Sequence, residues 1–180
     1  GHTLGLRHNM GASSATPVEK LRDAAYQDKN GHTSSIMDYA RFNYVAQPED
    51  SVTSLFPRIG EYDIWAIKWG YSYFEDTKTE AEEKAYLNEM TKEAYKNRRL
   101  WFGSETSPYD PRYQTEDIGD NAMRASEYGI KNLKRILPNL LEWSKEDGES
   151  YAELDELYGA LTGQFKRYMG HVTKNVGGIY

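Results

Sequence analysis

Two histidines and a glycine stand at three-residue steps in GHTLGLRHNM, the start of the chain, where His2 and His8 flank Gly5. This spacing constrains the backbone. Glycine enters the left-handed conformation without a steric penalty, and it is therefore the residue that most readily ends a helix. The chain can then reverse after Gly5 and carry His8 back toward His2. The spacing predicts a helix that ends at Gly5 and two imidazole rings that meet.

Imidazoles that meet in this way are common zinc ligands. The spacing H-x-x-G-x-x-H is the second half of the pattern H-E-x-x-H-x-x-G-x-x-H, in which three histidines hold zinc and the glutamate is a general base. In that pattern His2 and His8 are the second and third ligands, and the first histidine and the glutamate would stand before Gly1. We therefore expect a chain cut inside its metal site, and the ending NVGGIY predicts a second cut at the carboxyl end.

A second motif, SSIMDYA at residues 34–40, supports this interpretation. It resembles the Met-turn of metzincin zinc proteases, whose methionine packs beneath the zinc-binding imidazoles as a soft apolar floor. The resemblance gives that role to Met37. It also makes Tyr39 a candidate to stabilise the oxyanion, because astacin-like and serralysin-like Met-turns carry a tyrosine two residues after the methionine.

A closer resemblance covers more of the chain. GHTLGLRHNMGASS and HTSSIMDYARFNYVAQPED resemble a family of large bacterial Met-zincin proteins, best represented in Bacteroidetes, and residues 117–136 resemble its helical carboxyl-terminal part. The resemblance implies part of a zinc-dependent metalloendopeptidase that hydrolyses peptide or protein substrates by zinc-activated water. It implies an extracytoplasmic location, in the periplasm or cell envelope. The missing amino-terminal part would be a partner, and without it the fragment is expected to be inactive.

Composition excludes several other classes. The 180 residues carry 28 acidic and 22 basic side chains, a net charge of −6. Lysine and arginine are scattered among acids, which speaks against a nucleic-acid partner. No apolar run approaches the ~18 residues of a membrane-spanning helix. The absence of cysteine excludes disulfides and cysteine nucleophiles.

The sequence divides near residue 58. Residues 1–58 are rich in turn-forming residues, and we expect them to be a loop-rich segment of the catalytic domain that carries the third ligand and the Met-turn. Residues 59–180 are expected to form a helical carboxyl-terminal subdomain, in one compact unit with the first. Strand patterns are few, so the predicted fold class is mainly α. We expect helices at 16–28, 60–74, 79–97 and 120–137 and from 150 onward, with Thr16 and Thr79 as caps, and an ordered loop at 98–118.

Several other residues have simpler expected roles. Asp38 and Arg41 flank the Met-turn and are expected to form a structural salt bridge. Asn9 follows the third ligand and either orients it or caps the turn. The aromatic side chains of Trp65, Trp69 and Tyr71 are expected to pack in the core. Two further histidines, His32 and His171, have no partner at ligand spacing and are expected to be incidental.

Two other function classes stay open. The aromatic helices would also suit a non-catalytic interaction module, in which the histidines are relics. The chain would equally suit a structural module of a multidomain envelope protein. A His-Glu pair just before Gly1 would favour the enzyme over both.

Overall fold

The computed structural model describes residues 1–77, 79–104, 109–148 and 150–179. The fold is mainly α, as predicted, and these ranges contain no strand. No helix within them is long and apolar enough to cross a membrane. The α-helices are α1 (Ala24–Asn30), α2 (Glu61–Tyr71), α3 (Glu80–Ala94), α4 (Ala122–Ile136), α5 (Leu140–Ser144) and α6 (Ala152–Thr173).

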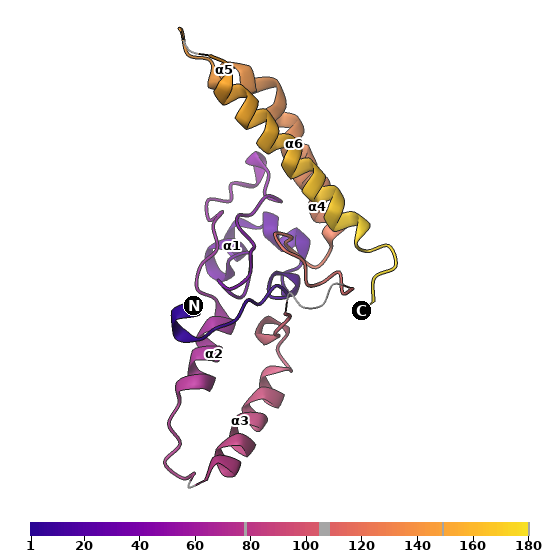
Figure 1. Cartoon of the computed structure of the whole chain (residues 1–180). Coiled ribbons are helices and arrows are strands. Elements are labelled where there is room, and N and C mark those ends of the chain that lie inside the picture. The colour runs from indigo at the N-terminus through magenta and orange to yellow at the C-terminus, as the bar shows by residue number, and fades with distance from the viewer. Residues whose placement is uncertain (78, 105–108, 149, 180) are drawn as a thin grey trace.

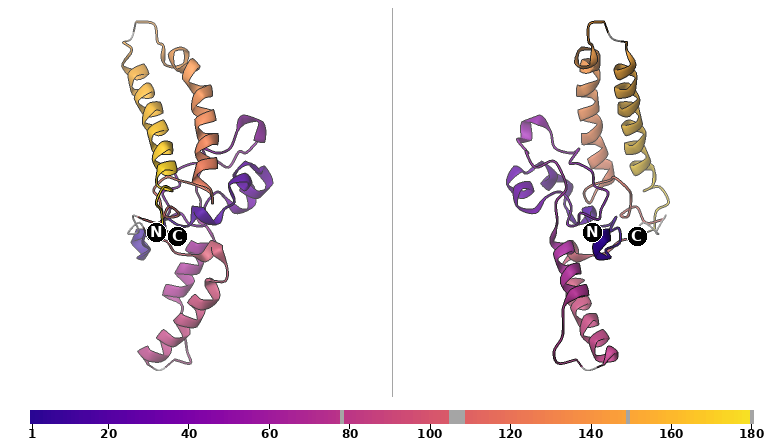
Figure 2. Two further views of the ribbon diagram at one scale, coloured as in Figure 1. Left: turned by 90° about the vertical axis from the view of Figure 1, so that its right-hand side faces the viewer. Right: turned by 60° about the vertical axis from the view of Figure 1, so that its left-hand side comes forward.

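The helices form two arms on either side of a loop-rich centre. Figure 1 shows α2 and α3 extending from the centre in one direction, and α4, α5 and α6 extending in the other. The same arrangement is visible from two further sides in Figure 2, where the chain start lies between the arms. The centre, which holds most of residues 1–58, therefore contacts both arms.

One apolar core joins the centre to the arm of α4 and α6. The ring of Tyr44, from the centre, lies 4.6 Å from the ring of Tyr168 on α6, centroid to centroid. Both rings pack over Gly129 of α4, where an added Cβ would lie 2.6 Å from the Tyr168 ring. The buried members of this core are Val18, Leu21, Ala40, Tyr44, Val45, Ile118, Ala125, Tyr128 and Tyr168.

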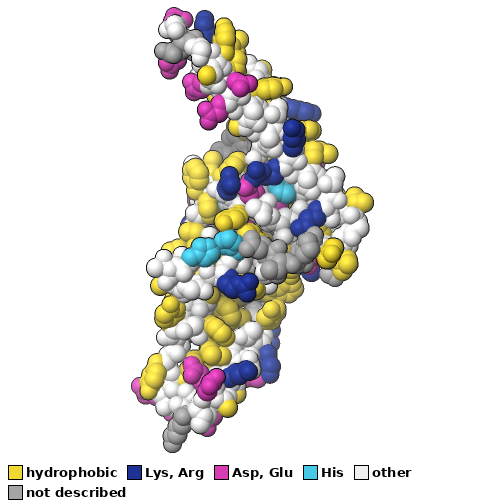
Figure 3. All heavy atoms as spheres, viewed as in Figure 1, with side chains coloured by type: hydrophobic (Ala, Val, Ile, Leu, Met, Phe, Trp, Pro, Cys, Tyr) yellow, Lys and Arg dark blue, Asp and Glu magenta, His cyan; other side chains and the backbone are white. Residues whose placement is uncertain are grey.

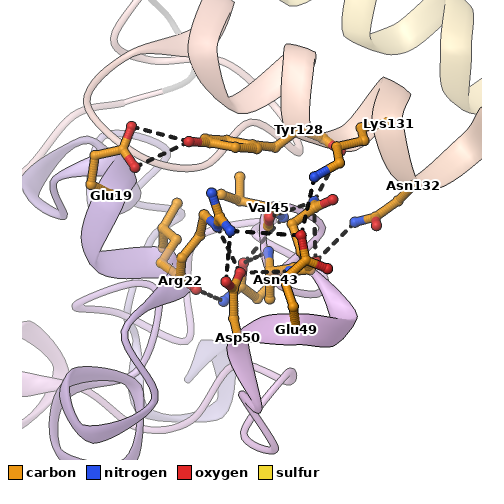
Figure 4. Close-up of polar contacts among 12 residues, drawn as sticks. Glu19, Arg22, Asn43, Val45, Glu49, Asp50, Tyr128, Lys131 and Asn132 are labelled. Atoms are coloured by element: carbon orange, nitrogen blue, oxygen red, sulfur yellow. Dashed lines mark hydrogen bonds and ion pairs between the residues drawn. The ribbon is translucent and has the colours of Figure 1, made fainter.

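Polar contacts tie the centre to α4 along a second line (Figure 4). The guanidinium of Arg22 donates two hydrogen bonds to the Asp50 carboxylate, at 2.6 and 2.7 Å. Lys131 of α4 donates to Glu49 at 3.1 Å. The amide of Asn132 donates to two backbone carbonyls of the centre, at 3.0 and 2.9 Å. The bonds of Lys131 and Asn132 fix the position of α4 against the loops, and the Arg22–Asp50 pair holds those loops together.

The helices predicted at 60–74, 79–97 and 120–137 are confirmed as α2, α3 and α4. The predicted capping box of α3 is present: the Thr79 hydroxyl accepts from the N–H of Glu82 at 3.3 Å, and the Glu82 carboxylate accepts from the N–H of Thr79 at 3.1 Å. The helix expected from residue 150 begins at Ala152. Of the expected loop at 98–118, residues 105–108 lie outside the described ranges.

The helix predicted at 16–28 with Thr16 as its cap is wrong. Residues 18–22 form a 3-10 turn, and α1 begins only after Asp23, whose carboxylate accepts from the N–H of Tyr26 at 3.0 Å. The reason is that Asp120, far along the chain, binds the backbone groups of residues 16 and 18. The carboxylate of Asp120 accepts from the N–H of Val18 at 2.8 Å, and the Asp120 N–H donates to the Thr16 carbonyl at 3.0 Å.

The packing over Gly129 makes a stability prediction. Gly129→Ala should lower the free energy of unfolding by about 1–3 kcal/mol, because the added methyl group overpacks a buried contact between two aromatic rings. Urea denaturation followed by circular dichroism measures it. Gly163→Ala in α6 is the matched control, since no atom lies within 4 Å of the added Cβ, and it should stabilise by roughly 0.5–1 kcal/mol. Equal effects of the two changes would contradict the packing.

Candidate metal centre

The two candidate metal ligands, His2 and His8, meet at the start of the chain. Their Nε2 atoms lie 2.9 Å apart, and their ring centroids lie 4.7 Å apart. A 3-10 turn over His2–Leu4 ends at Gly5, which has the left-handed φ of 77°. The backbone reverses there, and this reversal brings the His8 ring back to His2.

A backbone carbonyl orients the first of these rings. Nδ1 of His2 lies 2.9 Å from the carbonyl oxygen of Leu6, so Nδ1–H donates and Nε2 keeps the lone pair. In the observed pair Nε2–H of His8 then donates to His2. Two imidazole nitrogens on one tetrahedral zinc lie about 3.3 Å apart. The two Nε2 atoms would therefore need to move apart by only about 0.4 Å to bind the ion. Both side chains therefore fit the role of zinc ligands.

Met37 lies beside this pair. It is 6% exposed, and its sulfur packs so closely on Gly1 that any side chain at position 1 would collide with it. The N–H of Asn9 donates to the Met37 carbonyl at 3.0 Å, which joins the residue after His8 to the Met-turn. The Asn9 side chain instead bonds the backbone of residues 101 and 103, at 2.9 and 2.8 Å. The Asn9 side chain therefore joins the histidine segment to residues 101–103 and does not orient the His8 ring.

Tyr39 packs against His8. Its ring centroid lies 4.6 Å from that of His8, with the planes at 55°. The side chain is 45% exposed. The phenol of Tyr39 is therefore half-exposed beside His8.

Comparison with known protein families adds to this geometry. Residues 1–180 match one family, described as Met-zincin. The chain belongs to the Met-zincin family. No curated protein and no solved structure matches it. Membership supports a metalloprotease-related module and, in general terms, a link to zinc.

In this Met-zincin chain the candidate Met-turn, residues 34–40, is held by Asp63, which no local sequence pattern indicated. The buried carboxylate of Asp63 accepts from the hydroxyl of Ser35 at 2.6 Å and from the N–H groups of Ile36 and Gly60, each at 2.8 Å. The Ser35 hydroxyl in turn accepts from the N–H of Met37 at 3.0 Å. Asp63 also lies in the first turn of α2, and an acid there is common in helices, so its position carried no signal of this contact.

The start of α2 lies directly on the Met-turn segment. The N–H of Tyr62 donates to the Ser34 carbonyl at 3.0 Å. Gly60 permits this approach, because a Cβ at that position would overlap the backbone of Ser34. The start of the helix is therefore bonded directly to the backbone of this segment.

The predicted salt bridge between Asp38 and Arg41 is wrong. Asp38 is buried and accepts from the backbone N–H of Ser13 at 2.7 Å and the hydroxyl of Thr33 at 3.3 Å. Arg41 points outward and pairs with Glu116 at 2.8 Å. Asp38 is thus directed into the buried interior and Arg41 toward the solvent, and so the two charges do not meet.

An open cavity of about 620 Å³ lies against residues 4–7, the segment between the two histidines. Trp69 and Tyr71 line it and are 37% and 64% exposed, so their predicted place in the core is wrong. The Tyr71 hydroxyl donates to the Leu4 carbonyl at 3.1 Å, which joins α2 to the segment between the histidines. Figure 3 shows histidine side chains on this face in the middle of the molecule, with hydrophobic side chains beneath them. The other main lining residues are Leu4, Leu6, Arg7, Tyr62, Trp65, Tyr95 and Phe102.

The remaining histidines are structural. His32 and His171 are buried, and their Nε2 atoms bond backbone carbonyls, of Ala40 at 2.6 Å and of Thr115 at 3.0 Å. Burial lowers the pKa of both. In the described part of the chain, no three His, Cys, Asp or Glu side chains converge as a complete metal site. His2 and His8 are therefore an incomplete ligand set within these residues.

The contacts of Asp63 predict a strong dependence of stability on its charge. Asp63→Asn should lower the free energy of unfolding by about 1–3 kcal/mol, because an amide group replaces an oxygen that now accepts from buried donors. Denaturant unfolding provides the measurement. Asp155→Asn, an exposed acid in the first turn of α6, should stay within about 0.5 kcal/mol. An Asp63→Asn protein with an unchanged free energy of unfolding would show that Asp63 does not support residues 34–40.

Proposed function

We propose that the chain supplies the second and third zinc ligands and the Met-turn of a zinc-dependent metalloendopeptidase. The observation that carries the proposal is the approach of the two Nε2 atoms of His2 and His8 to 2.9 Å. Membership in the Met-zincin family supports it. The first histidine and the glutamate of the zinc pattern are absent from residues 1–180. A working site would need both groups, and residues 1–180 alone would not cleave peptides.

Each residue then has a defined task. His2, held by its bond to the Leu6 carbonyl, and His8 would hold the ion. Bound zinc would polarise the scissile carbonyl and lower the pKa of a nearby water molecule. Met37 would keep the floor beneath the rings dry and packed. Tyr39, at the exposed edge of His8, would donate a hydrogen bond to the oxygen that becomes negative in the transition state.

The cavity beside the histidines supports a peptide as the substrate. Its wall is mostly apolar and aromatic, and it includes the segment that joins the two ligands. A peptide whose scissile bond lay at the histidines would place a neighbouring side chain near this wall. Aromatic walls of this kind bind bulky apolar side chains.

One observation favours the alternative of a non-catalytic interaction module. The arm of α5 and α6 exposes large aromatic side chains, with Trp143, Tyr151 and Tyr158 at 62%, 66% and 52%. Exposed aromatics are enriched at protein interfaces. A protein that includes the complete zinc pattern, and that cleaves no peptide library when loaded with zinc, would favour the module over the enzyme.

Zinc binding by residues 1–180 tests the ligand pair. We expect weak binding that dialysis removes, because two ligands make a poor zinc site. His2→Ala and His8→Ala should each weaken it further by at least about 10–100-fold, as measured by isothermal titration calorimetry. Thr3→Ala, at an exposed position between the ligands, should leave it unchanged. Tight stoichiometric zinc that survives both histidine changes would place the metal elsewhere.

The role of Tyr39 is tested in a protein that includes the complete zinc pattern. Tyr39→Phe should lower kcat on the order of 10- to 1000-fold with little change in KM or zinc content, because the lost bond forms only in the transition state. Tyr158→Phe, on the exposed face of α6, is the control and should leave kcat unchanged. A kcat within about twofold for Tyr39→Phe would reduce Tyr39 to a packing partner of His8.

A further inference from the structure

The cavity against residues 4–7 has a single arginine in its wall. It lies between the chain start and the arm of α2 and α3 (Figure 1), and Arg7 is the only lysine, arginine, aspartate or glutamate among the described residues that line it. Arg7 is exposed and directly precedes His8. Its guanidinium forms no ion pair and no hydrogen bond with any described residue. This group is therefore free to bind a ligand that enters the cavity.

Three other polar side chains of the wall are already bonded to backbone carbonyls. The Tyr71 hydroxyl donates to the Leu4 carbonyl at 3.1 Å. The Trp69 ring N–H and the Thr91 hydroxyl both donate to the Leu87 carbonyl, at 3.2 and 2.9 Å. The guanidinium is always charged and presents a planar fork of N–H donors, so it is the strongest unoccupied donor in the wall.

Much of the remaining wall is a row of aromatic rings. Phe102 stacks on Tyr62 with the ring centroids 6.2 Å apart and the planes at 25°. The row continues from Tyr62 to Trp65 at 6.0 Å and from Trp65 to Trp69 at 6.5 Å. A cavity of about 620 Å³ lies within the usual size of ligand sites, about 300–1,000 Å³, and aromatic walls bind bulky apolar groups.

The combination of one cation and an aromatic wall selects the chemistry of the ligand. A guanidinium binds a carboxylate through two parallel N–H···O bonds, and an apolar wall beside it strengthens the attraction by excluding water. A cationic group would be repelled. The best ligand therefore carries a carboxylate next to an apolar group. A peptide offers such a carboxylate from two sources, its free carboxyl terminus and an aspartate or glutamate side chain.

We propose that Arg7 determines the substrate specificity of the site: it binds a carboxylate of the peptide while the aromatic row binds a neighbouring apolar side chain. Because Arg7 adjoins the candidate ligand His8, this carboxylate lies within a few residues of the scissile bond. The inference rests on the proposed function, which makes the ligand a peptide. Binding in the cavity needs no zinc, however, and is measured separately from cleavage.

Peptide binding to residues 1–180 without added metal tests the proposal. The first probe is an acetylated tripeptide of two alanines and a terminal phenylalanine with a free carboxyl terminus. The second is its carboxamide, and the third is that carboxamide with glutamate as the middle residue. At least one carboxylate peptide should bind about 10- to 100-fold more tightly than the plain carboxamide, as measured by tryptophan fluorescence. The tighter of the two identifies the source. Equal affinities, or no binding of any probe, would overturn the proposal.

Variants of Arg7 assign the preference to this side chain. Arg7→Gln should abolish the preference for a carboxylate and leave the affinity for the plain carboxamide unchanged, because the aromatic row stays intact. Arg7→Lys should keep part of it, since an ammonium group retains the charge without the planar fork. Lys166→Gln removes the same charge from an exposed position of α6, on the other arm, and should keep the full preference. A preference that survives in Arg7→Gln would overturn the assignment.

Cleavage by a protein that includes the complete zinc pattern separates this inference from the proposed function. Arg7→Gln should lower kcat/KM by about 10- to 100-fold for peptides with the preferred carboxylate, mainly through KM, and should leave other peptides unaffected. An equal loss for both kinds of peptide would overturn the role of Arg7 and leave the zinc peptidase intact. If that protein cleaves no peptide, yet binding still prefers a carboxylate and loses this preference in Arg7→Gln, the proposed function fails and the carboxylate site stands.

Discussion

The carboxylate of Asp63 is the contact on which the arrangement of the candidate site depends. One side chain holds the backbone of Ile36, the hydroxyl of Ser35 and the first residue before α2. Through Ser35 the bond network reaches the N–H of Met37, and from the Met37 carbonyl it reaches Asn9, next to His8. The position of a candidate ligand is thus set by a helix that starts more than fifty residues later in the chain.

Around residues 32–35 the buried interior is held together by hydrogen bonds more than by apolar contacts. Residues His32 to Ser35 are fully buried or nearly so, although all four are polar. Buried polar groups are stable only when their donors and acceptors are satisfied, and a satisfied network admits few alternative geometries. Residues 34–40 therefore have few alternative conformations open to them. Such a network would suit the proposed zinc site, because it would keep the segment beside the two imidazoles in place.

The sequence predicted structure correctly where it depends on interactions between neighbouring residues. The capping box of α3 needs only residues 79–82, and the left-handed turn at Gly5 needs only the absence of a side chain. It failed where a distant group competes. Thr16 carries a plausible cap signal, but Asp120 binds the same backbone from a hundred residues away. Asp38 and Arg41 are near in sequence and opposite in charge, yet burial separates them.

By itself the sequence determined the helical class, the histidine spacing and the Met-zincin resemblance, because periodicity, caps and short motifs are properties of neighbouring residues. Only the tertiary structure decided which groups support the site. It placed Asp63 against residues 35 and 36, turned Trp69 and Tyr71 outward to a cavity, and buried Asp38 away from Arg41. Those outcomes depend on contacts between segments far apart in the chain, and no local pattern records which distant donor or charge a side chain will meet.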